Sequence, residues 1–461
     1  MTPDEFRRHG HEVVEWIADY FETIRDRPVL PPVQPGDLTA QLPAHGPEEP
    51  EPMDRILADF RERIVPANTH WNHPAFHAWF SISGTPPAVL AEALAAALNV
   101  NGMLWKSSPA CTELEQLALH WLGEWLGLPP DWFGLIYDTA STAGVHALAC
   151  ARHRADPASR QHGNAGRHYT VYCSELAHSF IEKSAMTVGF GLDAVRRVPV
   201  DSAFRLRPDA LSALIAADRA TGRTPACIVA TIGTTAVASV DPLPAIAEIA
   251  AREKLWLHVD AAYAGAAAVS EKYRHHLAGA AAADSFAVNP HKWLLTPTDL
   301  CAFYTRDPAA LRGAFSLVPE YLRTDDGSAV NLMDYGFQLG RRFRALKLWF
   351  VMRSYGRRGV AAMIEGHCDM AADFASRLLA DGRFEIAAPV EFSLVCFRFR
   401  GSDEENRALL EAINATGRAF LSHAVVDGRY VLRMAIGNWQ TSREDMTKLA
   451  AMVTNLAPGA C

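Results

Sequence analysis

Short, continuous apolar runs alternate with helical stretches from about residue 86 onwards, and this alternation limits the possible folds more than any other feature of the chain. The runs are FGLIY, HYTVYC, ACIVATIG, KLWLHVD, SFAVN and LCAFYT. Strands that are apolar on both faces are typical of mostly parallel sheets that helices cover on both sides. The sequence therefore predicts an α/β domain built on such a sheet.

The N-terminal part shows a different pattern. Thr2, Pro3 and Glu5 form a capping box ahead of apolar residues at helical spacing, and a second amphipathic helix is expected at residues 56–64. The proline-rich connector, residues 28–52, is expected to hold neither a helix nor a central strand. Two helices separated in this way form a poor core of their own. We therefore expect a helical arm that packs on another surface, such as a partner subunit.

The C-terminal part predicts a small α+β domain. A hairpin is expected to turn at Asp427 and Gly428, and a last helix to be capped by Thr441 and Glu444. Before them come helices at 344–353, 360–380 and 404–414 and the apolar run FSLVCFRFR. We divide the chain into an N-terminal helical arm (1–84), a large domain (85–358) and a small C-terminal domain (359–461).

The composition is typical of a folded soluble protein. Of 461 residues, 49% are hydrophobic and 21% are charged. The 44 basic and 52 acidic residues give a formal charge of −8 without a basic block, which argues against nucleic acid or a membrane surface and favours a small-molecule partner. The eight cysteines lack short paired spacings, and we find neither a signal-peptide core nor a membrane-spanning run. We expect a cytoplasmic protein with reduced thiols.

Lys292 and Asp260 follow two of the predicted strands. Lys292 lies in NPHKW after SFAVN, in a partly apolar setting that lowers the pKa of its amine and suits a nucleophile. Asp260 ends the strand KLWLHVD. Because ligands of parallel sheets bind at the carboxyl ends of the strands, both side chains are expected to face one cavity. A surface lysine lying along Trp293 and an aspartate that caps a helix are the alternatives.

One amine and one carboxylate in this arrangement suit pyridoxal 5'-phosphate. The lysine forms a Schiff base with its aldehyde, and the aspartate keeps the pyridine nitrogen protonated. Donors for the phosphate are expected in YDTAS, with Ser141 at the start of a helix, while the turn TIGTT and Asn289 add polar groups. His178 stands where its ring could lie on an aromatic ring. Simple capping by Asp138 or Ser141, and a solvent contact of His178, are the alternatives.

Several long, rare strings run through the chain. They are EFRRHGHEVVEWIADY, THWNHPAFHAWF, SPACTELEQLALHWLG, HVDAAYAG, NPHKW and LGRRFRALKLWFVMRSYG. Through them almost the whole chain resembles the pyridoxal-phosphate-dependent aromatic L-amino-acid decarboxylases, which belong to the group II decarboxylases. The resemblance implies the fold type I architecture of pyridoxal-phosphate enzymes, an arm that crosses a two-fold interface, and a homodimer with active sites between its subunits.

The resemblance also implies roles for individual residues. Lys292 would bind the cofactor, Asp260 would pair with its pyridine nitrogen, and His178 would stack on its ring. The implied cofactor contacts are Ala140, Ser141, Thr235, Ala262, Asn289 and His291. The implied substrate pocket comprises Trp71, Phe80 and, from the neighbouring subunit, Val100 and Met103. No metal is expected.

Tyr321, in VPEYLRTDDGS, matches the tyrosine of the family's mobile loop, which closes over the substrate. In the family, this tyrosine and the histidine at the ring accompany decarboxylation, whereas relatives with other residues there make aldehydes oxidatively. The resemblance therefore implies a carboxy-lyase that converts an aromatic L-amino acid into an arylalkylamine and CO2, with Tyr321 returning a proton to the α-carbon. An oxidative aldehyde synthase and an acidic-amino-acid decarboxylase stay open. Lys292 and Asp260 argue against a non-catalytic scaffold.

The departures from the family lie near the substrate. Phe80 is followed by Ser81 instead of proline, Met103 replaces an aromatic ring, and residues 335–338 read YGFQ. They leave open which of tryptophan, phenylalanine, tyrosine and dihydroxyphenylalanine is preferred. Two other motif matches fail, because GFGLDA follows no strand and HEVVE lacks the second histidine of a zinc protease.

Overall fold

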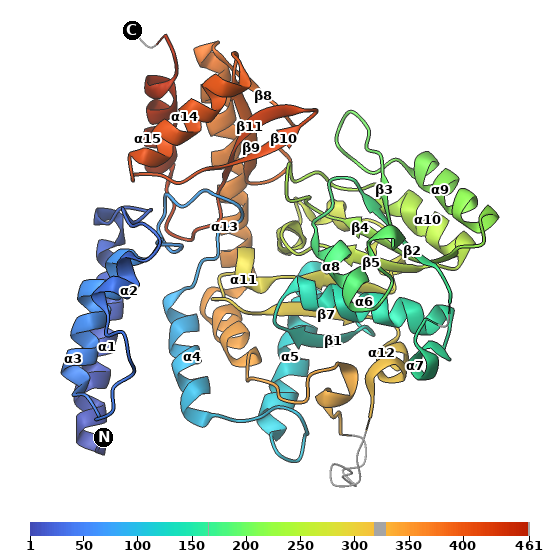
Figure 1. The fold of residues 1–461 in the computed structure, drawn as a ribbon, viewed down its shortest axis with the longest axis horizontal. Helices are drawn as coiled ribbons and strands as arrows, with labels where there is room; N and C mark the ends of the chain where they lie inside the picture. Colours follow the sequence, from blue (N-terminus) through green and yellow to red (C-terminus); the bar gives the residue numbers. More distant parts are fainter. Residues whose placement is uncertain (165, 318–328, 460–461) are drawn as a thin grey trace.

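The computed structural model describes residues 1–164, 166–317 and 329–459, and a seven-stranded sheet that contains all six predicted strands lies at its centre (Figure 1). In spatial order the strands are β1 (Phe133–Tyr137), β7 (Cys301–Thr305), β6 (Ser285–Val288), β5 (Trp256–Asp260), β4 (Thr224–Thr231), β2 (Tyr169–Ser174) and β3 (Val195–Val198). Strand β7 pairs antiparallel with both of its neighbours, and the other pairs are parallel. The predicted mostly parallel sheet is confirmed.

Strand β3 was not predicted from the sequence. Its residues, VRRV, include two arginines, and only Val198 is fully buried. The strand pairs with β2 alone, at the edge of the sheet. An edge strand does not need to be apolar on both faces, so a search for continuous apolar runs misses it.

Helices cover both faces of the large sheet, as predicted. Side chains along a strand alternate between two cores, because Leu135 and Tyr137 of β1 pack in one and Ile136 packs in the other. The core around Leu135 includes α6 (Ala140–Ala155), α8 (Phe180–Thr187) and α12 (Pro308–Phe315). The core around Ile136 includes α5 (Pro109–Leu126), α9 (Pro208–Ala220) and α10 (Leu243–Glu253).

The N-terminal arm consists of two helices that lie side by side at the edge of the molecule (Figure 1). Helix α1 (Pro3–Thr23) begins with the predicted capping box. Helix α3 (Met53–Asp59) continues into a π-helical turn, Phe60–Ile64. Trp16 of α1 packs edge-on against Phe60, with 4.8 Å between the ring centroids. The second predicted helix is therefore confirmed over the whole of its expected range.

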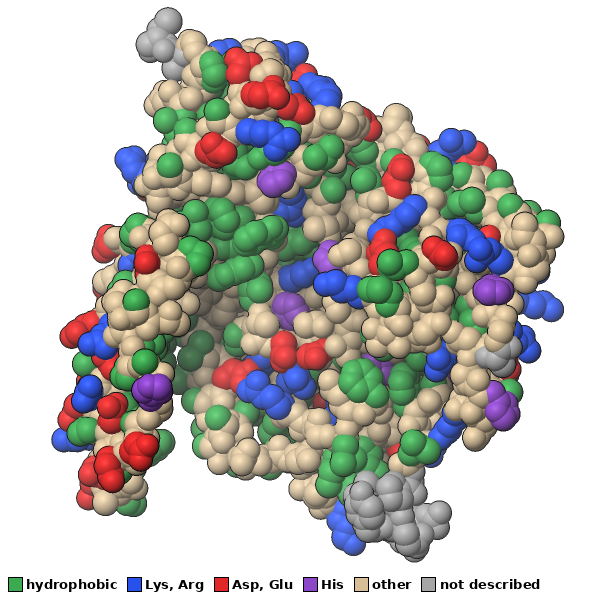
Figure 2. Space-filling view, in the orientation of Figure 1, with side chains coloured by type: hydrophobic (Ala, Val, Ile, Leu, Met, Phe, Trp, Pro, Cys, Tyr) green, Lys and Arg blue, Asp and Glu red, His purple; other side chains and the backbone are tan. Residues whose placement is uncertain are grey.

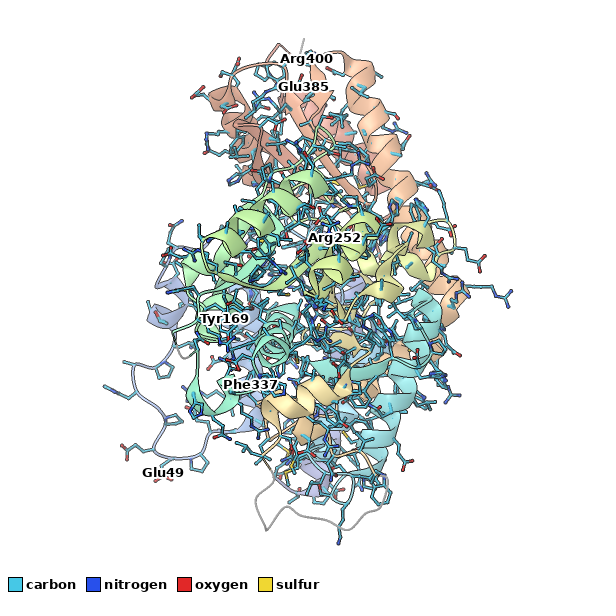
Figure 3. The ribbon with its side chains drawn as sticks, turned by 90° about the vertical axis from the view of Figure 1, so that its right-hand side faces the viewer. Glu49, Tyr169, Arg252, Phe337, Glu385 and Arg400 are labelled. Atoms are coloured by element: carbon cyan, nitrogen blue, oxygen red, sulfur yellow. The ribbon has the colours of Figure 1, made fainter. Side chains whose placement is uncertain are left out.

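The connector between the arm helices contains a helix that was not expected. Residues Asp37–Gln41 form the short helix α2, after Gly36 with a left-handed φ of 101°. This stretch carries no proline of its own, so the rule that excludes helix from proline-rich segments does not apply to it. Further along, the connector projects from the body around Glu49 (Figure 3).

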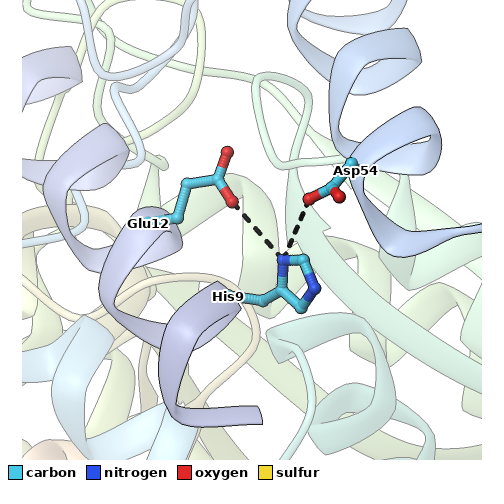
Figure 4. A group of neighbouring side chains, drawn as sticks. All are labelled: His9, Glu12 and Asp54. Carbon is cyan, nitrogen blue, oxygen red and sulfur yellow. Dashed lines mark hydrogen bonds and ion pairs between the residues drawn. The ribbon is translucent and has the colours of Figure 1, made fainter. Parts of the chain in front are cut away.

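A histidine and two carboxylates tie the arm helices together (Figure 4). His9 Nδ1 lies 3.4 Å from Glu12 Oε2 and 3.5 Å from Asp54 Oδ1. These three side chains could hold a metal ion. However, each carboxylate already has an arginine partner, Arg61 for Glu12 and Arg8 for Asp54. We interpret the group as an ion-pair network that stabilises the arm.

A four-stranded sheet forms the C-terminal part and confirms the predicted α+β arrangement (Figure 1). The hairpin turns at Asp427 and Gly428 with φ values of 50° and 73°, which a type I′ turn requires. Glu385 and Arg400 mark this sheet at one end of the molecule (Figure 3). In spatial order its strands are β10 (Ser422–Val426), β11 (Arg429–Ala435), β9 (Leu394–Phe399) and β8 (Phe384–Ile386).

Helix α13 (Ala345–Asp381) joins the two sheets. It holds both helices predicted there, separated at Gly356, where φ is 62°. The last helix, α15 (Arg443–Leu456), is capped by Ser442 and Asp445, so the predicted cap of Thr441 and Glu444 was wrong by one residue. In both pairs a hydroxyl residue is followed three positions later by an acidic residue, and the helix is capped by the second pair. The domain limits at 84 and 358 stay a prediction.

The remaining helices are α4 (Pro86–Leu98), α7 (Ser159–His162), α11 (Pro290–Trp293) and α14 (Asp403–Ala415). Helix α4 begins where the predicted alternation starts, and α11 is a short turn that holds PHKW, directly after Asn289. Within the described ranges, every helix is too short or too polar to span a membrane.

Candidate active site

Six strands of the large sheet end at one edge, and residues at the ends of five of them line a cavity. Because β7 alone among the strands of the sheet runs the other way, β1, β2, β4, β5 and β6 end at the same edge. Residues that follow these strands line a cavity of about 220 Å³, together with Phe80 from the segment before α4. The predicted site residues that line it are Phe80, Ala140, Ser141, His178, Thr235, Asp260, Ala262, Asn289, His291 and Lys292.

Lys292 and Asp260 reach the cavity from neighbouring strands. Asp260 is the last residue of β5, and Lys292 lies in α11 directly after β6. Burial lowers the pKa of the Lys292 amine, burial raises the pKa of Asp260, and the opposite charge of each opposes the shift of the other. Asp260 Oδ1 accepts a hydrogen bond from Ala262 N at 3.1 Å. Among the described residues, nothing hydrogen-bonds to Lys292 Nζ, so its amine is available to react.

Two histidines in the cavity present N–H donors. His178 Nδ1 accepts a hydrogen bond from Phe180 N at 3.0 Å, and His291 Nδ1 accepts one from Leu300 N at 3.0 Å. A neutral imidazole that accepts at Nδ1 carries its proton on Nε2. Partial burial and the nearby Lys292 lower the pKa of His178, and burial lowers the pKa of His291 to about 4. Both rings are therefore neutral donors at neutral pH.

The wall formed by the start of α6 suits an anion. The helix begins at Ala140 and is capped by Thr139, whose side chain accepts from Thr142 N at 3.4 Å. Asp138 and Ser141, the capping residues considered from the sequence, do not cap it. The hydroxyl of Ser141 and the N–H groups of Ala140 and Ser141, at the very start of the helix, thus lie at the cavity wall, where a phosphate binds best.

Two further residues of the cavity lining have distinctive surroundings. Asn289 Oδ1 is buried and has no hydrogen-bond partner among the described residues, and such atoms usually bind a ligand or water. Gly233 has a φ of 84°, and a Cβ atom there would lie 2.5 Å from Ala264 Cβ. Only glycine lets this turn pack so closely against the segment that follows β5.

Three predicted substrate-pocket residues do not line this cavity. Trp71 stacks on Phe76 and Trp79 and lines a separate cavity of about 550 Å³ beside the arm. Val100 and Met103 follow α4 and do not line the cavity of their own chain. Their role in binding substrate stays a prediction, since it was expected from the neighbouring subunit. Tyr321 lies outside the described residues.

Sequence reasoning missed four residues that line the cavity, namely Thr139, Phe180, Gly233 and Tyr263. Thr139 and Gly233 lie in the two turns singled out as YDTAS and TIGTT, so their position after a strand was a usable signal. Tyr263 lies between Phe80 and Trp293 in a stack of rings, with centroid distances of 3.7 and 4.7 Å. No local pattern indicates that stack, because its members come from three separate segments.

The residues present fit pyridoxal phosphate. Lys292 supplies an unpaired amine for an aldehyde, and Asp260 a buried carboxylate for a ring nitrogen. The first turn of α6, Ser141 and Asn289 supply polar groups for a phosphate. Ala262, small and 9% exposed, and His178 line the same cavity.

Comparisons with known proteins agree with this arrangement. Residues 35–400 match the family model described as the pyridoxal-dependent decarboxylase conserved domain. The chain is 41% identical to tyrosine decarboxylase 4 of Petroselinum crispum, over 96% of this chain and 91% of that protein. It is 40% identical to phenylacetaldehyde synthase of a Rosa hybrid cultivar, over 97% and 93%.

A solved structure is also similar. The structure of Oryza sativa TDC with PLP and tryptamine superimposes with a TM-score of 0.96 and 37% identity, over 99% of this chain and 98% of that one. Such agreement over nearly the full length confirms the fold type I architecture expected from the sequence. The chain belongs to the pyridoxal-dependent decarboxylase family.

Proposed function

We propose that this protein decarboxylates an aromatic L-amino acid to the corresponding arylalkylamine and CO2. The observation that carries the proposal is that Lys292 and Asp260 both line one buried cavity at the strand ends. The names of the relatives support the substrate class, since they include decarboxylases of tyrosine and tryptophan.

The residues of the chain divide the work between them. Bound pyridoxal phosphate supplies an electron-accepting ring that stabilises the negative charge left when CO2 departs. Lys292 presents its uncharged amine, which burial favours, and Asp260 holds a proton at the ring nitrogen. His178 offers its Nε2–H to the substrate carboxylate and so orients it. Phe80 and Tyr263 form an apolar wall that helps to exclude water.

A product assay tests this function. Purified, cofactor-loaded protein is incubated with tryptophan, phenylalanine, tyrosine, dihydroxyphenylalanine and glutamate, and CO2, amine, aldehyde and hydrogen peroxide are quantified. We expect equal amounts of CO2 and amine from at least one aromatic substrate. Aldehyde and peroxide in place of amine would assign the oxidative reaction of the Rosa relative, and turnover of glutamate alone would assign an acidic substrate.

Lys292→Ala provides the control for the site itself. The variant lacks the only amine that lines the cavity within the described residues, so turnover and the long-wavelength absorbance of the bound cofactor should both disappear. Lys183→Ala, which removes a lysine of α8 that does not line the cavity, should leave both unchanged. Retention of either signal in Lys292→Ala would contradict the assignment.

We also propose a homodimer in the cytoplasm. Leu90, Leu94 and Leu98 recur on one face of α4 and are 54%, 50% and 60% exposed. An apolar cavity lies between this helix and α1, and hydrophobic side chains gather where the arm meets the body (Figure 2). A second subunit would cover this surface and could bring Val100 and Met103 to the active site. The free, buried cysteines of the described residues suit a reducing compartment.

A further inference from the structure

Arg433 differs from the other buried arginines of the described residues. Arg341 pairs with Glu115 at 2.5 Å, and Arg398 pairs with Asp403 at 2.6 Å. Arg433, in β11, is 2% exposed and has no carboxylate partner in the part of the chain described. A buried charge without a counter-ion costs stability, so it usually persists for a functional reason.

Three segments meet at the Arg433 guanidinium. Nε donates to the carbonyl of Thr235 at 2.9 Å, in the turn that lines the cavity. Nη1 donates to the carbonyl of Trp79 at 2.5 Å and to Ser422 Oγ at 3.4 Å. Nη2 is buried and has no partner among the described residues. One side chain of the C-terminal sheet thus holds two walls of the cavity in place.

The guanidinium also packs against the Phe80 ring. Arg433 Cζ lies 4.5 Å from the ring centroid, and Lys292 Nζ lies 5.3 Å from the same centroid. The Phe80 ring is further held by Tyr263, which stacks on it at 3.7 Å and bonds to Ser393 through its hydroxyl. Arg433 and the reactive amine of Lys292 therefore both lie close to the Phe80 ring.

Within the described part of the chain, the Lys292 amine has five titratable or charged neighbours. The groups that face Lys292 are Asp260 of β5, Cys301 of β7, His178 after β2, His291 in α11 and Arg433 of β11. Burial is the largest cause that lowers the pKa of Lys292; Asp260 and Cys301 raise it, and Arg433 makes a smaller contribution that lowers it. Because both histidines are neutral, Arg433 is the one fixed positive charge in this set.

We propose that Arg433 is a positioning residue for the active site: from the C-terminal sheet it fixes Phe80 and the Thr235 turn, and its charge lies against the same Phe80 ring as the Lys292 amine. The inference rests on the proposed function for its catalytic meaning. It assigns Arg433 no contact with substrate or cofactor.

Three variants in the full-length, cofactor-loaded protein test the proposal. Arg433→Met removes both the positive charge and the forked guanidinium that donates the hydrogen bonds, whereas Arg433→Lys keeps the charge alone. Arg398→Met removes a buried arginine of the same sheet that already has an acidic partner. The measurements are kcat, KM, the thermal midpoint, the cofactor dissociation constant and the pH midpoint of the cofactor's absorbance change.

The proposal predicts a different pattern for each variant. Arg433→Met should raise the absorbance midpoint and lower kcat/KM on the order of 100-fold, mainly through kcat. Arg433→Lys should keep the midpoint near that of the wild type and still lower kcat/KM by about 10-fold, since an ammonium cannot bridge the same carbonyls. Arg398→Met should lower the thermal midpoint and leave the absorbance midpoint and kcat/KM unchanged.

Wild-type absorbance midpoint and kcat/KM in Arg433→Met would overturn the proposal, whatever its thermal stability. If that variant does not fold, Arg433→Lys decides alone, and a wild-type kcat/KM in it overturns the positioning role. The absorbance midpoint and the cofactor dissociation constant do not depend on turnover. A wild-type protein that releases no CO2 would therefore refute the proposed function and leave the role of Arg433 to be decided by these two measurements.

Discussion

Removal of the Asp260 carboxylate should weaken binding of pyridoxal phosphate by an amount that the structure allows us to estimate. One carboxylate oxygen accepts a hydrogen bond from Ala262 N, and no described donor occupies the other. A hydrogen bond between a buried carboxylate and a protonated ring nitrogen contributes about 1.5–3 kcal/mol. Since 1.4 kcal/mol is tenfold in affinity, Asp260→Ala should raise the cofactor dissociation constant about 10- to 150-fold.

Titration of cofactor-free protein with pyridoxal phosphate, followed by absorbance, measures this constant. Asp260→Asn should fall between the wild type and Asp260→Ala, because the amide keeps a neutral hydrogen-bonding group at the same place. Asp241→Asn is the matched control. Asp241 is also a buried aspartate after a neighbouring strand, but it accepts from Leu206 N and Thr231 N and does not line the cavity.

The control separates a binding role from a general loss of stability. Asp241→Asn should lower the free energy of unfolding by about 1–3 kcal/mol, since a buried N–H loses its acceptor, and should leave the cofactor constant unchanged. If Asp260→Ala bound pyridoxal phosphate as tightly as the wild type does, the carboxylate would not pair with the cofactor. The assignment of the cavity would then be refuted.

Three further results are expected. Burial lowers the pKa of His77, His146 and His367 to about 4 in the folded protein, whereas histidines of an unfolded chain titrate near about 6.5. The unfolded chain therefore binds more protons as the pH drops from about 6.5 towards about 4, so the urea concentration at the unfolding midpoint should fall over this range. An unchanged urea midpoint would contradict this prediction. Leu94→Arg places a charge on the exposed face of α4 and should convert the dimer into monomers in sedimentation experiments, and a monomeric wild type would refute the proposed interface. Tyr321→Phe should divert product from amine to aldehyde with consumption of oxygen, whereas an unchanged amine yield would exclude Tyr321 as the proton donor.

The candidate site illustrates how far local signals reach. Asp260, Lys292 and the turn before α6 were predicted because each directly follows a strand, and the parallel arrangement then brings strand ends together. Trp71 lines a different cavity of the single chain, so its expected place in the substrate pocket stays a prediction. Arg433 carried no signal, since an arginine in an alternating strand normally faces solvent.

Local sequence patterns were sufficient for the helices, the buried strands and the residues at their ends, because capping, periodicity and continuous apolar runs act over a few neighbouring residues. The reversed direction of β7, the edge strand β3 and the one-residue shift of the last helix cap depended on neighbours distant in the chain. The same is true of the contacts of Arg433 with Thr235 and Trp79. Such contacts arise only when separate segments pack together, so their physical cause lies in the tertiary structure.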